Sequence, residues 1–156
     1  MKKVISEDTL TKEYFKILDE TFARHHGIYL DENTSLFETL ETVTAEEASR
    51  PVGDKCASLA AQVAHVTFYL DVLEGYLIHK SAGKVDWDET WRTIHAVTPD
   101  EWNLLRDNLK QTHRRVLKTL HGLNWAADRS IGGALGILVH TAYHLGEIRQ
   151  ALCTIK

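Results

Sequence analysis

The sequence predicts an all-α protein, a four-helix bundle with short extra helices in its connectors. Four stretches of the chain repeat apolar residues at helical spacing. Only two prolines occur, so long helices are permitted almost everywhere. The length of 156 residues suits a single domain, 1–156, built around one core.

The first stretch covers residues 9–26, and Gly27 is expected to end it. The connector after it contains two capping boxes, at residues 35–38 and 44–47, in which a hydroxyl and a carboxylate satisfy free backbone N–H groups. These boxes predict two short helices. The second stretch, residues 57–79, is apolar on most of its circumference and is therefore expected to be central.

A long connector follows, and it contains Trp87 and Trp91, four residues apart. This spacing fits a lid formed by one helical turn. The large area that a tryptophan buries favours the other interpretation, which is packing against the end of the bundle.

The third helix has the clearest start in the chain. Thr98 fits the N-cap, Pro99 fits the first helical position and Glu101 completes a capping box, while Gly122 is expected to end the helix. The fourth helix is expected over residues 130–155 and is apolar nearly all round. The fourth helix contains glycines at positions 132, 133, 136 and 146. Because glycine lowers helix stability, several glycines together predict close approach by a helix, a ligand or a second subunit.

Charge and composition exclude several classes of function. The net charge is −4 and no run of basic residues occurs, so no nucleic-acid partner is expected. The polar start does not resemble a secretory signal, and no stretch approaches the ~20 apolar residues that span a membrane. Cys56 and Cys153 have no paired motif, so we expect two small core hydrophobes in a reduced, cytoplasmic protein.

Two of the nine histidines stand out by their spacing. His140 and His144 are four residues apart in an apolar helix, so both rings project from one face. Buried imidazoles need partners for their nitrogens, and a metal ion is one such partner. A pair with this spacing also arises by chance, so a third ligand is required before a metal site is inferred.

His65 is the best candidate for that ligand. It belongs to a polar stripe on the otherwise apolar second helix, which indicates a cavity or pocket wall, and facing helices of a bundle can bring inward side chains to one metal. The alternative is a core histidine whose ring is satisfied by Tyr69 or by a backbone carbonyl.

The helix order and these histidines resemble the DinB/YfiT-like superfamily of bacterial metal-binding four-helix bundles. The matching segments are SLAAQVAH at 58–65 and HTAYHLGEIRQ at 140–150, and the similarity in layout extends over nearly the whole chain. The resemblance implies that His65, His140 and His144 are the metal ligands. The family often has glutamine three residues after the last histidine, where this chain has Glu147. Glu147 could hydrogen-bond a ligand ring or a metal-bound water, ligate directly, accept a proton, or simply pair with a nearby Arg or Lys.

Three neutral imidazoles suit one divalent transition metal, with zinc or nickel expected first, and leave open coordination positions. The resemblance implies thiol-dependent chemistry. The leading hypothesis is therefore an enzyme that transfers a low-molecular-weight thiol to an electrophilic small-molecule substrate, with Glu147 and Tyr143 assisting. The HExxH pattern of zinc peptidases is absent, because Thr141 follows His140.

Two alternatives stay open, a metal-dependent hydrolase and a non-catalytic metal-binding dimeric module. A second stripe on the fourth helix is predicted to be either core or half of a subunit interface, since the resemblance also implies a homodimer. This stripe comprises Ile131, Leu135, Leu138, Ala142 and Leu145.

Overall fold

The computed structural model of the chain describes residues 4–53, 56–79 and 83–156, and this part of the chain is all-helical. Its seven helices are α1 (Glu7–Phe22), α2 (Leu36–Glu41), α3 (Ala45–Ser49), α4 (Leu59–His79), α5 (Glu89–Thr93), α6 (Pro99–His121) and α7 (Asp128–Ile155). Over the described ranges, none of these helices is both long enough and apolar enough to cross a membrane.

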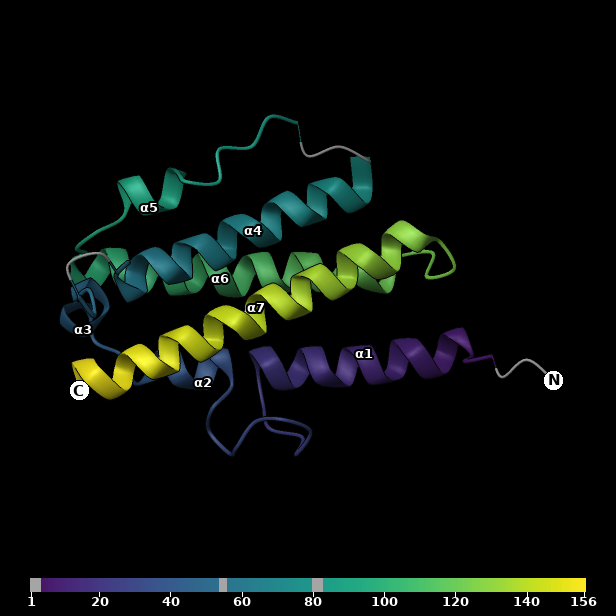
Figure 1. The fold of residues 1–156 in the computed structure, drawn as a ribbon, viewed down its shortest axis with the longest axis horizontal. Coiled ribbons are helices and arrows are strands. Elements are labelled where there is room, and N and C mark those ends of the chain that lie inside the picture. Colours follow the sequence, from purple (N-terminus) through teal and green to yellow (C-terminus); the bar gives the residue numbers. More distant parts are fainter. Residues whose placement is uncertain (1–3, 54–55, 80–82) are drawn as a thin grey trace.

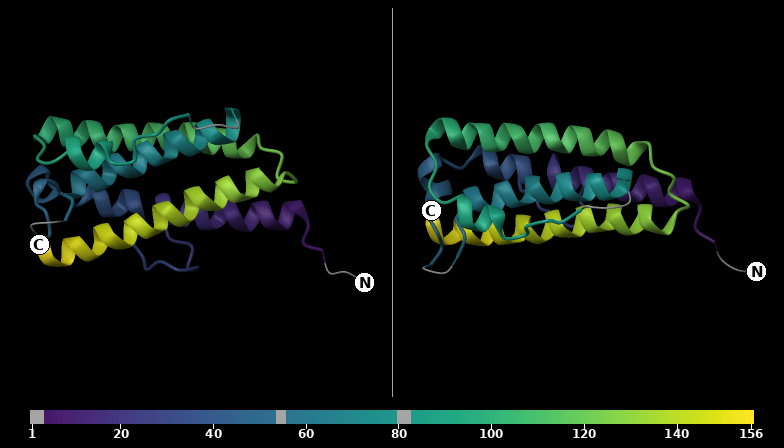
Figure 2. Two further views of the ribbon diagram at one scale, coloured as in Figure 1. Left: turned by 45° about the horizontal axis from the view of Figure 1, so that its top comes forward. Right: turned by 90° about the horizontal axis from the view of Figure 1, so that it is seen from above.

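Four helices are long and share one core. In Figure 1, α7 crosses in front, with α4 above it, α1 below it and α6 behind. The two views of Figure 2 show the same long helices running side by side. Helix α4 packs against both α6 and α7, so it lies at the centre, as its apolar circumference predicted.

The predicted helix starts are confirmed where a cap was visible in the sequence. Thr98 accepts a hydrogen bond from the backbone N–H of Glu101 at 3.3 Å, and α6 begins at Pro99. Both short helices, α2 and α3, begin at capping boxes. An N-cap side chain contributes about 1 kcal/mol to helix stability, which explains why even short helices form here.

The end of the first helix was predicted wrongly. Helix α1 ends at Phe22 rather than near residue 26. The fully buried carboxylate of Glu20 accepts hydrogen bonds from the backbone N–H groups of His26, Ile28 and Tyr29, at 3.0–3.2 Å. These bonds fold the following chain back onto the helix, because a buried carboxylate requires such donors.

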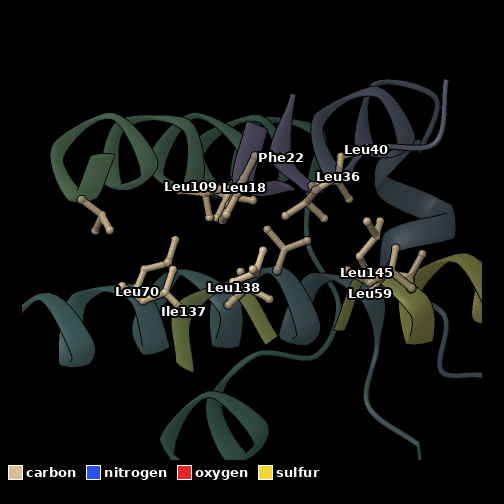
Figure 3. Packing of buried hydrophobic residues seen from close by; sticks show 14 of the residues in the cluster. Leu18, Phe22, Leu36, Leu40, Leu59, Leu70, Leu109, Ile137, Leu138 and Leu145 are labelled. Carbon is tan, nitrogen blue, oxygen red and sulfur yellow. The ribbon is translucent and has the colours of Figure 1, made fainter. Parts of the chain in front are cut away.

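The core is formed by aliphatic and aromatic side chains from all four long helices and α2. In Figure 3, Leu18 of α1 and Leu109 of α6 point toward Leu70 of α4 and Ile137 of α7. Each of these side chains is at most 1% exposed. Burying one such side chain contributes roughly 1.5–3 kcal/mol, so this cluster fixes the positions of the helices that carry the histidines.

Two of the α7 glycines permit close packing of α7 on α4. A Cβ added at Gly133 would lie 2.5 Å from Cδ2 of Leu77, and one added at Gly136 would lie 3.1 Å from Cδ1 of Leu73. The predicted close approach by a helix is therefore confirmed for these two positions. Gly132 and Gly146, in contrast, face open space.

The prediction that both cysteines are core residues is wrong, because Cys56 and Cys153 are both exposed. Cys56 precedes α4 in a connector, and Cys153 lies on the outward side of α7. The second stripe on α7 is mostly core, since Leu138 and Leu145 are buried, but Leu135 is 45% exposed. Residue type alone therefore did not determine burial at these positions.

Candidate metal centre

The three predicted histidines lie together between α4 and α7. His140 Nε2 is 3.2 Å from His65 Nε2 and 3.2 Å from His144 Nε2. One nitrogen from each ring belongs to a group whose atoms all lie within 4.8 Å of one another. His65 and His144 are buried, and His140 is half-buried. The three imidazoles are thus close enough to hold a metal ion.

The spacing of these nitrogens fits a transition metal. Two bonds of about 2.0–2.1 Å at a tetrahedral angle place their nitrogens about 3.3–3.4 Å apart. The observed separations of 3.2 Å are close to this value. No fourth histidine, cysteine or carboxylate joins the group within the described part of the chain.

The hydrogen-bond partners of His144 Nδ1 determine which ring nitrogen of His144 carries the proton. His144 Nδ1 lies 2.6 Å from Gln62 Oε1 and 2.9 Å from Glu147 Oε2. Both oxygens only accept hydrogen bonds, so Nδ1 carries the proton and donates it. His144 Nε2 therefore directs a lone pair at His140. A cation between the rings would satisfy these nitrogens together.

Burial keeps the three rings neutral. It lowers the pKa of His65 to about 4 and that of His140 to about 3, and the neighbouring imidazoles add to the shift. Burial also lowers the pKa of His144, although the carboxylate of Glu147 acts in the opposite direction. Neutral imidazole is the form that binds metals, so no proton competes for these nitrogens near pH 7.

Aromatic rings pack against two of the candidate ligands. Tyr69 stacks on His140, with ring centroids 3.4 Å apart and planes 6° apart. Trp91 of α5 stacks on His65 at 4.2 Å. His140 Nδ1 is buried without a hydrogen-bond partner, so on that side stacking on Tyr69 holds the ring. Of the two tryptophans that were considered as a lid, Trp91 covers the site through its stacking on His65, and Trp87 packs on Tyr69 nearby.

Two residues that support the site were not predicted to do so. Gln62 holds His144, and Thr90 Oγ1 lies 3.2 Å from His65 Nδ1. Gln62 lies one turn before His65 on the same polar stripe, which is a signal that the sequence offered. Thr90 comes from the connector between α4 and α6, and nothing in the local sequence placed it beside α4.

The two predicted catalytic residues border this site without joining the ligand group. Glu147 is half-buried, and its carboxylate lies against His144. Tyr143 is 61% exposed, and its hydrogen bond to Glu147 raises the pKa of its phenol. Of the roles considered for Glu147, contact with a ligand ring is the one that this geometry fits.

A pocket of about 710 Å³ opens beside His144. Its walls combine the site residues with apolar side chains from the connectors on either side of α4. They include Gln62, Trp91, Ile94, Tyr143, His144 and Glu147. The volume suits a small molecule, for which typical pockets measure roughly 300–1,000 Å³.

The fold and this site together define a class: an all-helical protein with a three-histidine site able to hold a metal ion. In comparisons with known proteins, no family model, no curated sequence and no solved structure matched the chain. The functional argument therefore depends on the residues and on their geometry.

Proposed function

We propose that the chain is a metal-dependent enzyme that transfers a low-molecular-weight thiol to an electrophilic small molecule. The four long helices would then form the four-helix bundle of the DinB/YfiT-like superfamily, and the protein would act in the cytoplasm. One observation carries the proposal: three imidazole nitrogens converge, one of them from His144 in the wall of a pocket, with no fourth protein ligand among the described residues. A structural metal site is normally closed by a fourth ligand, whereas a catalytic site keeps a position open.

His65, His140 and His144 would hold the metal, and Gln62 and Thr90 would orient two of them. A bound zinc or nickel ion supplies a Lewis acid that lowers the pKa of a thiol or a water in an open position. The rings are already neutral and partly preoriented, so the chain undergoes little reorganisation to form the site.

In this proposal, Glu147 would also accept the thiol proton. Its carboxylate lines the pocket and lies against His144. The thiol would lose its S–H proton to this carboxylate, and the sulfur electron pair would form a bond to the electrophilic carbon. The proton then returns to the substrate on addition, or departs with the leaving group on substitution. Tyr143, hydrogen-bonded to Glu147, would position the carboxylate.

Metal content tests the site itself. We expect about one metal per purified chain, and loss of most of it in His140→Ala and in His144→Ala, because such sites depend on each ligand. His79→Ala provides a matched control, since His79 is exposed at the end of α4. Unchanged metal in both α7 variants would refute the assignment.

Turnover tests the chemistry. A panel of biological thiols is assayed with chlorodinitrobenzene as the electrophile and a nitrophenyl ester as a hydrolysis probe. The proposal expects thiol-dependent, chelator-sensitive turnover that Glu147→Gln lowers by roughly 10²–10⁴-fold, the usual contribution of a general base. Chelator-sensitive ester cleavage without any thiol reaction would instead indicate a hydrolase. Metal binding with no turnover in either assay would indicate a non-catalytic module.

A further inference from the structure

A second pocket adjoins the one beside His144 and follows the last third of α7. It measures about 560 Å³, and its remaining walls come from the start of α4 and the connector before it. In Figure 1, α3, which precedes that connector, and the C-terminal end of α7 lie at the same end of the molecule. We call this second pocket the α7 groove. The residues that it shares with the first pocket are Cys56, Ala57, Gln62, Tyr143 and Glu147.

The walls of both pockets carry little charge. Among the described residues that line them, Glu147 is the one aspartate, glutamate, lysine or arginine. Its carboxylate already bonds to His144 and to Tyr143. The described walls therefore offer no lysine or arginine to a carboxylate or a phosphate on a ligand, and burying an unpaired anion is costly. Both pockets thus suit an uncharged molecule.

Gly146 forms an open part of the wall of the α7 groove. A Cβ added at this position would have no heavy atom within 4 Å, so packing inside the chain does not require a glycine here. Glycine in an exposed helix lowers stability by up to ~1 kcal/mol relative to alanine. In the wall of a pocket, the missing side chain leaves room for a ligand to lie against the helix backbone. Of the α7 glycines, Gly146 is the one that lines these pockets.

The rest of the groove combines hydrocarbon with uncharged hydrogen-bonding groups. Val52, Leu59 and Ala151 contribute apolar surface to its walls. Gln150 and Thr154 contribute an amide and a hydroxyl, which both donate and accept hydrogen bonds. At 1.5 Å per residue, the groove reaches about 15 Å along α7 from the level of His144 to that of Thr154. These walls suit an extended chain that carries amide or hydroxyl groups.

We propose that the α7 groove binds the uncharged, extended body of a small molecule whose reactive end lies beside His144. The ligand class is a neutral amide with an acyl chain. The chain lies over Gly146 and against the apolar walls, and the amide meets the uncharged polar side chains. Molecules that carry a carboxylate or a phosphate on this chain are disfavoured. The inference rests on the proposed function for the chemistry of the reactive end, whereas the groove is tested by binding alone.

Binding of N-acylcysteamines, which are neutral amides with a thiol at one end, tests the groove. Titration calorimetry of the zinc-loaded full chain under anaerobic conditions compares the acetyl, butanoyl and hexanoyl compounds. Each buried CH₂ group is expected to tighten binding by about twofold to fourfold. The adipoyl compound has the length of the hexanoyl compound but ends in a carboxylate, and it is expected to bind at least about tenfold more weakly. No binding of the hexanoyl compound, an affinity independent of chain length, or equal affinity for the adipoyl compound overturns the proposal.

A pair of glycine variants locates the bound chain. Gly146→Leu fills the groove, so it is expected to abolish the gain in affinity with chain length and to leave binding of the acetyl compound unchanged. Gly132→Leu is the matched control, because Gly132 is equally open on the same helix but lines neither pocket. Circular dichroism reports that both variants keep the fold. A gain with chain length that survives in Gly146→Leu, or that is lost equally in both variants, contradicts the proposal.

S-methyl derivatives of the same amides separate the groove from the proposed thiol chemistry. They keep the acyl chain but have no S–H proton to lose, so they cannot bind a metal as thiolates. If both series gain affinity with chain length while the thiols bind no more tightly than the thioethers, the groove is supported and the thiol chemistry is refuted. If the thiols bind more tightly at every length and neither series gains with length, the thiol chemistry is supported and the groove is refuted.

Discussion

Buried and half-buried imidazoles occur on two sides of this molecule, and they differ in what surrounds their nitrogens. Between α4 and α7, three rings turn Nε2 toward one another. On the side formed by α1, α2 and α6, His113 instead stacks on Phe22 at 4.3 Å and meets the edge of Phe37. The first arrangement brings lone pairs together, and the second buries ring faces among hydrocarbon.

The pKa values do not separate these two environments. Burial lowers the pKa of His113 to about 4, the same value that it gives His65. Burial is the largest cause of both shifts, so a lowered pKa does not by itself identify a metal site. Convergence of nitrogen atoms beside a pocket is the observation that distinguishes a candidate metal site from a core histidine.

The largest effect expected from this difference is on metal-dependent stability. Zinc at a hundredfold excess over its Kd should raise the free energy of unfolding of the wild type by about 2.7 kcal/mol. His65→Ala should lose most of this increase, because it removes the ligand from α4. His113→Phe should retain the full increase. Urea unfolding with and without zinc measures it, and comparing each variant with itself cancels any change in intrinsic stability.

Equal zinc stabilisation of His65→Ala and the wild type would remove the distinction between the two sides. It would mean that the three rings lie together without binding one metal ion. Loss of zinc stabilisation in His113→Phe would also contradict the distinction, since His113 packs on Phe22 and Phe37 on the other side of the molecule.

A smaller effect is expected at the residue that orients His144. Gln62→Leu removes the hydrogen bond from Nδ1, and loss of such a partner weakens metal binding by roughly 10–100-fold. Gln111→Leu is the control, because Gln111 is exposed on α6. Competition with a chromophoric chelator measures the affinity. An unchanged affinity in Gln62→Leu would show that Glu147 alone fixes the ring.

Local chemistry made much of the fold predictable. The starts of α2, α3 and α6 followed from capping boxes, which are short and depend only on neighbouring residues. The placement of His140 and His144 on one face of α7 followed from helical spacing for the same reason. For His65, helical spacing left a core histidine as an alternative, and the resemblance to a family favoured a ligand role.

The remaining features depend on contacts that a helical pattern does not contain. The end of α1 is set by Glu20, whose carboxylate binds the chain that follows it. Thr90 reaches His65 from a connector 25 residues further along the chain. Cys153 was expected in the core because of its residue type, but it lies on the outward side of α7. In each case tertiary position overrode a local preference.

The smallest effect expected concerns acid stability, and it tests His113. Its ring is neutral in the folded chain down to about pH 4, whereas in the unfolded chain it binds a proton near pH 6.5. Between these values the unfolded chain holds more protons, so stability falls as pH falls. Below about pH 4 both states are protonated, and the loss levels off. His113→Phe keeps the aromatic packing and removes this component.

Between pH 7 and pH 4.5, the free energy of unfolding of the metal-free wild type should therefore fall by about 1–2 kcal/mol more than that of His113→Phe. This figure reduces the effect of the His113 pKa shift to allow for partial exposure of the ring. Urea unfolding in chelator at several pH values gives both curves. His65 and His140 titrate in both proteins, so the difference isolates His113, with nearby Asp19 and Arg114 opposing each other. If the free energy of unfolding depends on pH in the same way in both proteins, His113 is solvated. It could then no longer serve as the core histidine with which the three candidate ligands are compared.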